Sequence, residues 1–253
     1  MSFIAFLGIN SPHNWAYKGP KKDDTPLYKQ FTLIMAESLH MQHPNEAVHF
    51  YAVNFPEDFK QQLLQLNPSI IFTERKEDFS AYSQQHYKGW LMATKGAHIL
   101  KTLQEQQKPL IYFDVDVLIR KKITRIQNMI ENKAEITCLY RPYMPKDKHY
   151  ATGLVGFGHN DNVLAFVQEW QQLMESQITN FMRPRSKGRS VSGDQLLLKQ
   201  CLEKRKMKFK ALPLSLNDGF LNKESEVWHG HKESKWKNLE IFQKELKRLK
   251  LEA

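Results

Sequence analysis

Hydrophobic runs alternate with amphipathic stretches along most of the chain. The runs are short, rich in β-branched or aromatic residues and bounded by polar residues, glycine or proline, which predicts strands. The segments with this pattern are Phe3–Gly8, Val48–Val53, Ser69–Thr73, Leu110–Phe113, Ile136–Tyr140, Leu154–Phe157 and Phe209–Leu214. Apolar residues at helical spacing predict helices over Phe31–Leu39, Phe59–Leu66, Tyr87–Leu103 and Val163–Met174.

Two of the predicted helices carry start signals. Asn160 or Asp161 is placed to cap the helix that holds Val163, and Ser192-Gly193-Asp194-Gln195 has the form of a capping box. The alternation of strands and helices predicts an α/β fold with a mostly parallel central sheet and helices on both faces. Neither a repeat nor a low-complexity linker interrupts this pattern, so residues 1–253 are predicted to form a single domain.

The composition is that of a globular protein. Of 253 residues, 41% are hydrophobic and 25% are charged, which excludes a disordered, collagen-like or coiled-coil chain. No apolar stretch reaches the ~20 residues of a membrane span, and the N-terminus begins with a strand-like run instead of a signal peptide. Only Cys138 and Cys201 are present, so a disulfide framework is not expected, which favours a cytoplasmic protein.

Basic residues outnumber acidic ones by 37 to 27, which gives a formal net charge of +10. This surplus indicates either an anionic partner or a solvated basic face, and local clusters lie in residues 120–125 and 183–189. A basic C-terminal segment, about residues 237–253, is predicted to be helical with an apolar stripe of Leu239, Phe242, Leu246 and Leu249. The stripe either packs on the domain or docks the protein on an anionic membrane or glycolipid at the inner face of a membrane.

The strongest chemical signal is the strand Leu110–Phe113 together with the two carboxylates that follow it, Asp114 and Asp116. Ligands bind at the carboxyl edge of an open α/β sheet, so acids at this point are well placed for a site. Carboxylate oxygens suit Mg²⁺ or Mn²⁺, and such a cation bridges the oxygens of a diphosphate. The plainer interpretation is that the two acids mark a strand end and a turn.

Three features further along the chain are consistent with the same site. Gly153 flanks a predicted strand and allows a sugar or phosphate to approach the backbone, although such glycines serve packing equally well. Asp194 and Gln195 begin a helix, where capping and the helix dipole also favour them. The last feature is a polar stretch that forms either a surface loop or one wall of a metal and diphosphate site. Its characteristic residues are Trp228, His229, His231, Lys232, Lys235 and Trp236.

In this order, the motifs resemble those of metal-dependent glycosyltransferases of the GT-A fold, most closely the family-eight type and its relatives that use nucleotide-diphosphate sugars. The resemblance extends from about Phe3 to Trp236 and depends on the order of the motifs. It implies a GT-A-like fold and a hexosyltransferase-type reaction, in which a sugar passes from a UDP-sugar to a hydroxyl of a carbohydrate or glycolipid acceptor. It also implies Mn²⁺ or Mg²⁺ as cofactor and retention at the anomeric carbon, with no nucleic acid as partner.

The resemblance further implies roles for individual residues. Asp114 and Asp116 match the Asp-x-Asp that binds the metal, and His229 matches the late metal-ligating histidine. Asp194 and Gln195 match the pair near the anomeric carbon and the acceptor, which makes them the catalytic candidates. The residues implied to bind the donor nucleotide-sugar are Asp114, Lys95, Gly153, Lys232 and Lys235.

The late motif departs from the family pattern at two points: Gly230 directly follows His229, and no proline precedes Trp236. His231 therefore remains a rival of His229 for the metal, and Lys232 remains a rival of Lys235 for the diphosphate. The Leu-Pro/Asn stretch of the family is matched only loosely, by Leu212-Pro213 with Asn217.

Two other functions remain open. Residues 113–116 also resemble the first motif of haloacid-dehalogenase-like phosphatases, in which the first aspartate is a nucleophile. That motif normally follows the first strand and needs a later acidic pair, whereas Gly193-Asp194 is followed at the matching place by Leu198. A basic nucleic-acid-binding protein is the second alternative, although no recognition motif of the usual classes is present.

Overall fold

The computed structural model describes residues 2–8, 25–80, 84–145, 148–182, 193–230 and 235–252. Within these residues, seven strands form a central sheet in the order β3-β2-β1-β4-β7-β6-β8. The strands are β1 (Ser2–Gly8), β2 (Val48–Val53), β3 (Ile70–Arg75), β4 (Leu110–Phe113), β6 (Ile136–Tyr140), β7 (Tyr150–Phe157) and β8 (Phe209–Leu212). Each of the predicted strands is therefore present, with ends shifted by a few residues.

The central sheet is mixed but mostly parallel. Strand β1 pairs in parallel with β2 and β4, β2 pairs in parallel with β3, and β6 pairs in parallel with β8. Only β7 runs antiparallel to its two neighbours, β4 and β6. The predicted fold class is confirmed, with β7 as the element that makes the sheet mixed.

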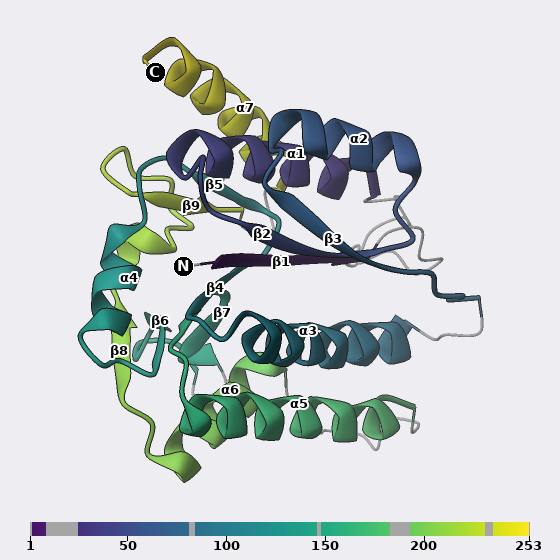
Figure 1. The fold of residues 1–253 in the computed structure, drawn as a ribbon, viewed down its shortest axis with the longest axis vertical. Coiled ribbons are helices and arrows are strands. Elements are labelled where there is room, and N and C mark those ends of the chain that lie inside the picture. The colour runs from purple at the N-terminus through teal and green to yellow at the C-terminus, as the bar shows by residue number, and fades with distance from the viewer. Residues whose placement is uncertain are drawn as a thin grey trace.

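Helices cover both faces of the sheet (Figure 1). Helices α1 and α2 pack on one face, and α3, α5 and α6 pack on the other. Their bounds, with those of α4 and α7, are α1 (Thr25–Gln42), α2 (Glu57–Leu66), α3 (Gln84–Gln106), α4 (Thr124–Glu131), α5 (Asp161–Met182), α6 (Asp194–Arg205) and α7 (Lys235–Glu252). This arrangement is the helix–sheet–helix layering that the sequence predicts.

Strand β4 lies between two hydrophobic cores. Ile111 and Phe113 belong to the core under α1 and α2, whereas Leu110 and Tyr112 belong to the core under α3 and α5. All four side chains are buried, because successive residues of a strand point to opposite faces and both faces are covered. The carboxyl end of β4 is therefore rigidly placed before the chain reaches its first carboxylate.

A second, two-stranded sheet was not predicted. Strand β5 (Val117–Ile119) pairs antiparallel with β9 (Val227–His229), so the stretch interpreted as a loop around Trp228 begins as a strand. Three residues are too few for a hydrophobic period to be recognised. The partner of each strand also lies far away in sequence, so no local pattern indicates the pairing. Helix α4 was also missed, although its buried residues Ile126 and Ile130 lie at helical spacing.

The two predicted helix starts have different outcomes. Asn160 caps α5, because its side-chain oxygen accepts a hydrogen bond from the Val163 N–H at 2.8 Å. At α6 the N-cap position is held by Gly193, which makes no side-chain cap hydrogen bond, and Ser192 of the predicted capping box lies outside the described residues. The Gln195 carboxamide instead accepts a hydrogen bond from Arg141 at 3.2 Å, which is a tertiary contact that local spacing does not reveal.

The apolar stripe of α7 packs on the rest of the protein. Leu239, Phe242 and Leu246 are buried in a cluster with residues of α1, β5 and β9, and Phe242 contacts Phe31 edge to face. These three side chains are buried and the fourth of the stripe, Leu249, is half-buried, so the membrane-docking alternative loses most of the surface on which it was based. Among the described residues, no helix combines the length and apolar character needed to cross a bilayer.

We predict that Phe242→Ala lowers the free energy of unfolding by about 3–5 kcal/mol, because it removes a fully buried ring between α1 and β9. Leu251→Ala on the same helix is the control, since Leu251 is 89% exposed. Urea unfolding followed by circular dichroism measures both variants. Equal midpoints for Phe242→Ala and the wild type would contradict the packing described above.

Candidate functional site

Asp114 extends from the carboxyl end of β4 with its position fixed by two contacts. Its backbone N–H donates to the Gly153 carbonyl at 2.8 Å, which continues the β4–β7 ladder by one step. The Tyr112 hydroxyl donates to Asp114 Oδ1 at 2.7 Å. Burial and the nearby Asp114 carboxylate raise the pKa of Tyr112 well above its ordinary value, so the hydroxyl remains a donor. One carboxylate oxygen of Asp114 is thus held by a side chain of the strand that precedes it.

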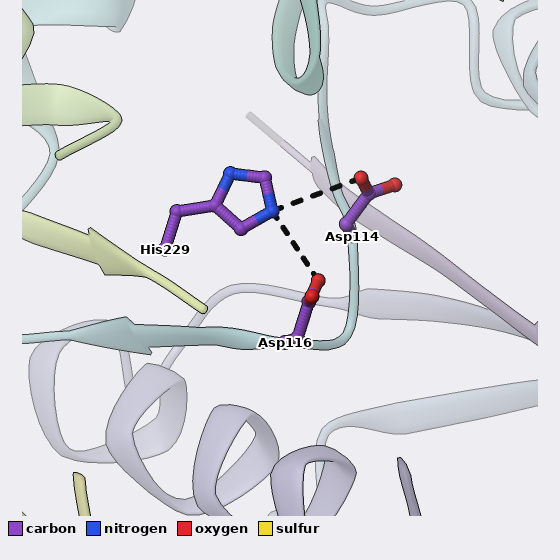
Figure 2. Close-up of side chains that lie close together, drawn as sticks. All are labelled: Asp114, Asp116 and His229. Atoms are coloured by element: carbon purple, nitrogen blue, oxygen red, sulfur yellow. Dashed lines mark ion pairs between the residues drawn. The ribbon is translucent and has the colours of Figure 1, made fainter. Parts of the chain in front are cut away.

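His229 reaches the carboxylates through the pairing of β5 with β9. Val117, which follows Asp116, lies opposite His229, and the Gly230 N–H donates to the Asp116 carbonyl at 2.7 Å. His229 Nε2 lies 3.3 Å from Asp116 Oδ1 and 3.9 Å from Asp114 Oδ2 (Figure 2). The three candidate ligands predicted from the sequence therefore converge, although they come from two distant segments.

The imidazole of His229 is oriented by the residues that precede β9. Its Nδ1 lies 2.7 Å from the side-chain oxygen of Asn217, and its backbone N–H donates to the Asp218 carbonyl at 2.9 Å. An amide oxygen only accepts hydrogen bonds, so Nδ1 is the donor to Asn217 and Nε2 is the ring atom that faces the carboxylates. A second hydrogen bond of this kind is the usual support of a metal-ligating histidine.

The donor set of this cluster fits a divalent cation. The ligand atoms of Asp114, Asp116 and His229 all lie within 4.8 Å of one another. Asp116 is buried, and the other two side chains are partly exposed, so the cluster is open on one side. Two carboxylates and one imidazole give a mixed oxygen and nitrogen set, which suits Mn²⁺ better than the harder Mg²⁺.

Gly153 on β7 provides the space for the His229 ring. A Cβ at this position would overlap the ring of His229 and lie 3.0 Å from Asp114 Oδ2. Any side chain would therefore displace the imidazole from the carboxylates. Within this structure the glycine serves the close approach of His229, a function that differs from the predicted contact with a donor sugar.

A second polar centre lies next to the first and contains three further predicted residues. Lys95 on α3 forms an ion pair of 2.6 Å with Asp194, the first residue of α6. The Thr152 hydroxyl donates to the same Asp194 oxygen at 2.8 Å, and the Gln195 N–H bonds to the other oxygen at 3.0 Å. The Trp170 indole N–H donates to the Asp194 carbonyl at 3.2 Å. The start of α6 is thus fixed by α3, α5 and β7 together.

Both members of this ion pair are charged. Burial alone would lower the pKa of Lys95, but the carboxylates of Asp194 and Asp114 outweigh burial and raise it. Burial would likewise raise the pKa of Asp194, but Lys95 and Thr152 outweigh it and lower that pKa. The Lys95 ammonium also lies 5.0 Å from the centre of the Tyr112 ring. Because the Tyr112 hydroxyl bonds to Asp114, one tyrosine contacts both polar centres.

The remaining predicted site residues are only partly described. Lys235 begins α7, and its side chain is among those not described. His231 and Lys232 lie outside the described residues, so neither rivalry is tested by the geometry. Residues 9–24, which follow β1, also lie outside them.

Sequence reasoning missed several side chains that support the site. Tyr112 could have been found, because it precedes Asp114 by two residues and a strand places such pairs on one face. Thr152 adjoins Gly153 but carries no distinguishing pattern. Asn217 stood in a loosely matched motif, and its bond to His229 depends on a turn that the sequence does not specify.

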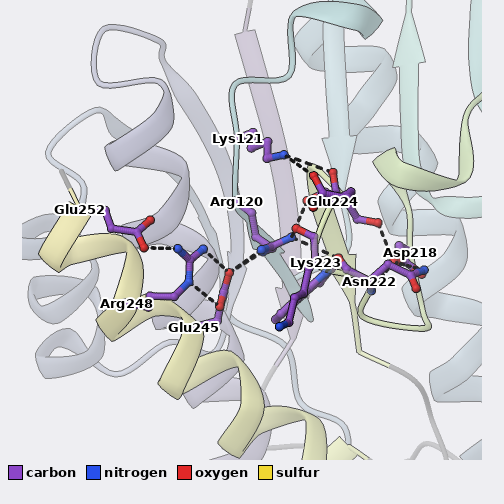
Figure 3. A network of polar contacts seen from close by, with 11 residues as sticks. Arg120, Lys121, Asp218, Asn222, Lys223, Glu224, Glu245, Arg248 and Glu252 are labelled. Carbon is purple, nitrogen blue, oxygen red and sulfur yellow. Dashed lines mark hydrogen bonds and ion pairs between the residues drawn. The ribbon is translucent and has the colours of Figure 1, made fainter.

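Arg120 anchors the segment that precedes β9 (Figure 3). Its guanidinium bonds to Glu245 of α7 at 2.7 Å and donates to the carbonyls of Lys223 and Ser225 at 2.6 and 2.7 Å. It also lies 4.2 Å from the centre of the Trp228 ring. Arg120 therefore ties α7 to the loop that carries Trp228 and, next to it, His229.

Three of the four charges in the basic cluster predicted in residues 120–125 have partners within the chain, whereas the fourth, Lys122, is exposed. Arg120 is buried, and Arg125 forms an ion pair of 3.2 Å with Glu226. Lys121 donates to the Glu224 carbonyl at 3.3 Å. These charges face acidic or carbonyl groups of the chain itself, whereas the cluster in residues 183–189 lies outside the described residues.

The sequence matches no protein-family model and no curated protein. In structure, the chain is similar to the galactosyltransferase LgtC, whose crystal structure contains donor and acceptor sugar analogues. The two structures superpose with a TM-score of 0.58 at 12% sequence identity, over 98% of this chain and 96% of that chain. This likeness shows that the chain has the fold of the GT-A glycosyltransferases, as predicted.

We predict that Gly153→Ala weakens Mn²⁺ binding by about 10–100-fold, because the added methyl group displaces His229 from Asp114 and Asp116. Calorimetric titration with MnCl₂ measures the affinity. Gly193→Ala is the matched control, since a Cβ there meets nothing within 4 Å. Unchanged Mn²⁺ affinity in Gly153→Ala would show that His229 does not take part.

A second prediction concerns Glu245, the partner of Arg120. Hydrogen bonds from Arg248 and Arg120 outweigh burial and lower the pKa of Glu245 below 4.5. The resulting stabilisation is present above the unfolded-state pKa and is lost as the pH falls through the folded-state pKa. Glu245→Gln should lower the free energy of unfolding by about 2–3 kcal/mol at pH 7, and by less as the pH approaches 3. Urea titrations across this range, with exposed Glu240→Gln as control, would refute the prediction if the difference did not shrink with acid.

Proposed function

We propose that the protein is a metal-dependent glycosyltransferase that transfers a sugar from a UDP-sugar to a hydroxyl group of a carbohydrate or glycolipid acceptor. In this proposal residues 1–253 act as a single GT-A-like domain. The observation that carries it is the convergence of Asp114, Asp116 and His229 at the carboxyl end of β4. The likeness to a galactosyltransferase with bound donor and acceptor analogues supports the same conclusion.

Asp114, Asp116 and His229 are proposed to hold the cation, Mn²⁺ in preference to Mg²⁺. When bound, the cation neutralises the charge that develops on the leaving diphosphate. Tyr112 and Asn217 keep the ligands in place, since each bonds to the atom of Asp114 or His229 that faces away from the shared centre. This preorganisation limits the reorganisation needed when the cation and nucleotide bind.

Asp194 and Gln195 are proposed to lie near the anomeric carbon and the acceptor. Lys95 and Thr152 hold the Asp194 carboxylate at 2.6 and 2.8 Å, so it stays ionised at neutral pH. An ionised carboxylate at this point can stabilise positive charge that develops on the transferred sugar, or accept a hydrogen bond from one of its hydroxyls. Lys95, bound to Asp194 and close to Tyr112, is then positioned beside the donor sugar.

The donor diphosphate is proposed to contact Lys235 at the start of α7, with Lys232 as its rival. Asp114 also approaches the ribose or the sugar of the donor in this proposal, and transfer proceeds with retention at the anomeric carbon. The phosphatase alternative is not favoured, because Asp114 follows the fourth strand and Asp194 is paired with Lys95. The nucleic-acid alternative loses part of its basis with the internally paired charges at residues 120–125.

Calorimetric titration of UDP in the presence of Mn²⁺ tests the proposal. We expect His229→Ala to weaken UDP binding by more than about tenfold. Loss of a residue that only hydrogen-bonds to a metal ligand already costs about that much at metal sites, and His229 is proposed to be a ligand itself. His231→Ala should bind UDP nearly as the wild type does, and titrations without metal should show weak binding in all three proteins. Tight binding by His229→Ala with loss in His231→Ala would move the ligand to His231. Equal binding by all three would reject the metal site.

A further inference from the structure

Arg141 stands beside the second polar centre without a carboxylate partner among the described residues. Its Nη2 donates to the Gln195 side-chain oxygen at 3.2 Å and to the Lys148 carbonyl at 3.0 Å. Its Nε is fully buried and makes no hydrogen bond to the described part of the chain. The side chain as a whole is half-buried, so part of the guanidinium remains accessible.

The described carboxylates of Asp194 and Asp114 are already engaged. Gln195 directly follows Asp194, but one Asp194 oxygen accepts bonds from Lys95 and Thr152, and the other from the Gln195 N–H. Asp114 is bonded to Tyr112 and belongs to the metal-binding cluster. Neither carboxylate compensates the charge of Arg141.

Desolvation makes this uncompensated charge costly. Burial lowers the pKa of Arg141, and the two groups that oppose the effect, Tyr143 and Cys138, are not carboxylates. An arginine stays protonated in proteins, so its positive charge persists at neutral pH. A guanidinium offers five N–H donors in a planar fork that matches a carboxylate or phosphate, and to the described residues it makes only two bonds.

We propose that Arg141 binds a carboxylate or phosphate group carried by one of the two sugar substrates. The proposal rests on the proposed glycosyltransferase function, because Gln195 is then close to the reacting sugars. An anionic group at this position would accept the N–H donors of Arg141 Nη1 and neutralise the charge of the guanidinium. Gln195, which contacts Arg141, directly follows Asp194 in the chain. Lys95 already neutralises the Asp194 carboxylate, so this carboxylate and the bound anionic group would not repel each other strongly.

Paired ligands that differ only in charge test this proposal. Glucuronate and glucose 6-phosphate are compared with glucose as acceptor probes, in the presence of saturating UDP and Mn²⁺. UDP-glucuronate is compared with UDP-glucose as the donor probe. Calorimetric titrations give the affinity of each, and the donor and acceptor arms identify which substrate carries the anion.

We expect the wild type to prefer the charged member of one pair by about tenfold or more, as charge-assisted hydrogen bonds to arginine allow. Arg141→Gln should abolish this preference, and Arg141→Lys should retain part of it, since lysine keeps the charge but not the fork. Arg205→Gln is the matched control, because Arg205 lies at the other end of α6 and is paired with Glu169 at 2.6 Å. It should keep the full preference.

Three outcomes would overturn the proposal: equal affinity for both members of every pair, a preference that survives Arg141→Gln, or a preference that appears only in Asp147→Asn. The last result would mean that Arg141 serves Asp147, which lies outside the described residues. UDP binding with Mn²⁺ is measured first in every variant. Absence of UDP binding by the wild type would reject the proposed function itself, whereas UDP binding without a charge preference rejects only the role of Arg141.

Discussion

The antiparallel pairing of β5 with β9 is the contact on which the rest of the site depends. It sets His229 opposite Val117 and thereby brings an imidazole to the two carboxylates that follow β4. Strands of three residues have little stability of their own, so their surroundings must hold them together. Arg120 does this with hydrogen bonds to the loop before β9 and to α7, while α1 and α7 enclose the pair in apolar side chains. The site is therefore as stable as the packing of the C-terminal helix.

Features that depend on local pattern could be predicted from the sequence. Strand β4 is buried on both faces, and this condition produces the unbroken apolar run that identifies it. The carboxylates of Asp114 and Asp116 follow from the same observation, because open α/β sheets bind ligands at that edge. The fold class could be predicted as well, because it depends only on the alternation of strands and helices, which is also a local pattern.

Features that depend on distant partners could not be predicted. Lys95 and Asp194 lie 99 positions apart, and helix capping already explained an acid at the start of α6. Likewise, a count of basic residues places Arg120 in a charged patch, whereas the structure buries it against Glu245 and backbone carbonyls. In each case a local preference was enough to explain the residue type, so nothing in the sequence indicated the tertiary contact that the structure shows. His229 itself was identified through a resemblance of motifs, since spacing alone gives no reason to link it with Asp114.

The late position of β9 has a consequence for the protein during its synthesis. A ribosome releases Asp114 and Asp116 well before His229, and the loop between β5 and β9 can close only after the second strand has emerged. Until then the nascent chain presents two carboxylates without the imidazole, and the apolar face of α1 lacks α7 to cover it. The three candidate ligands are therefore complete only after β9 has emerged, and the apolar face of α1 is covered only after α7 has followed it.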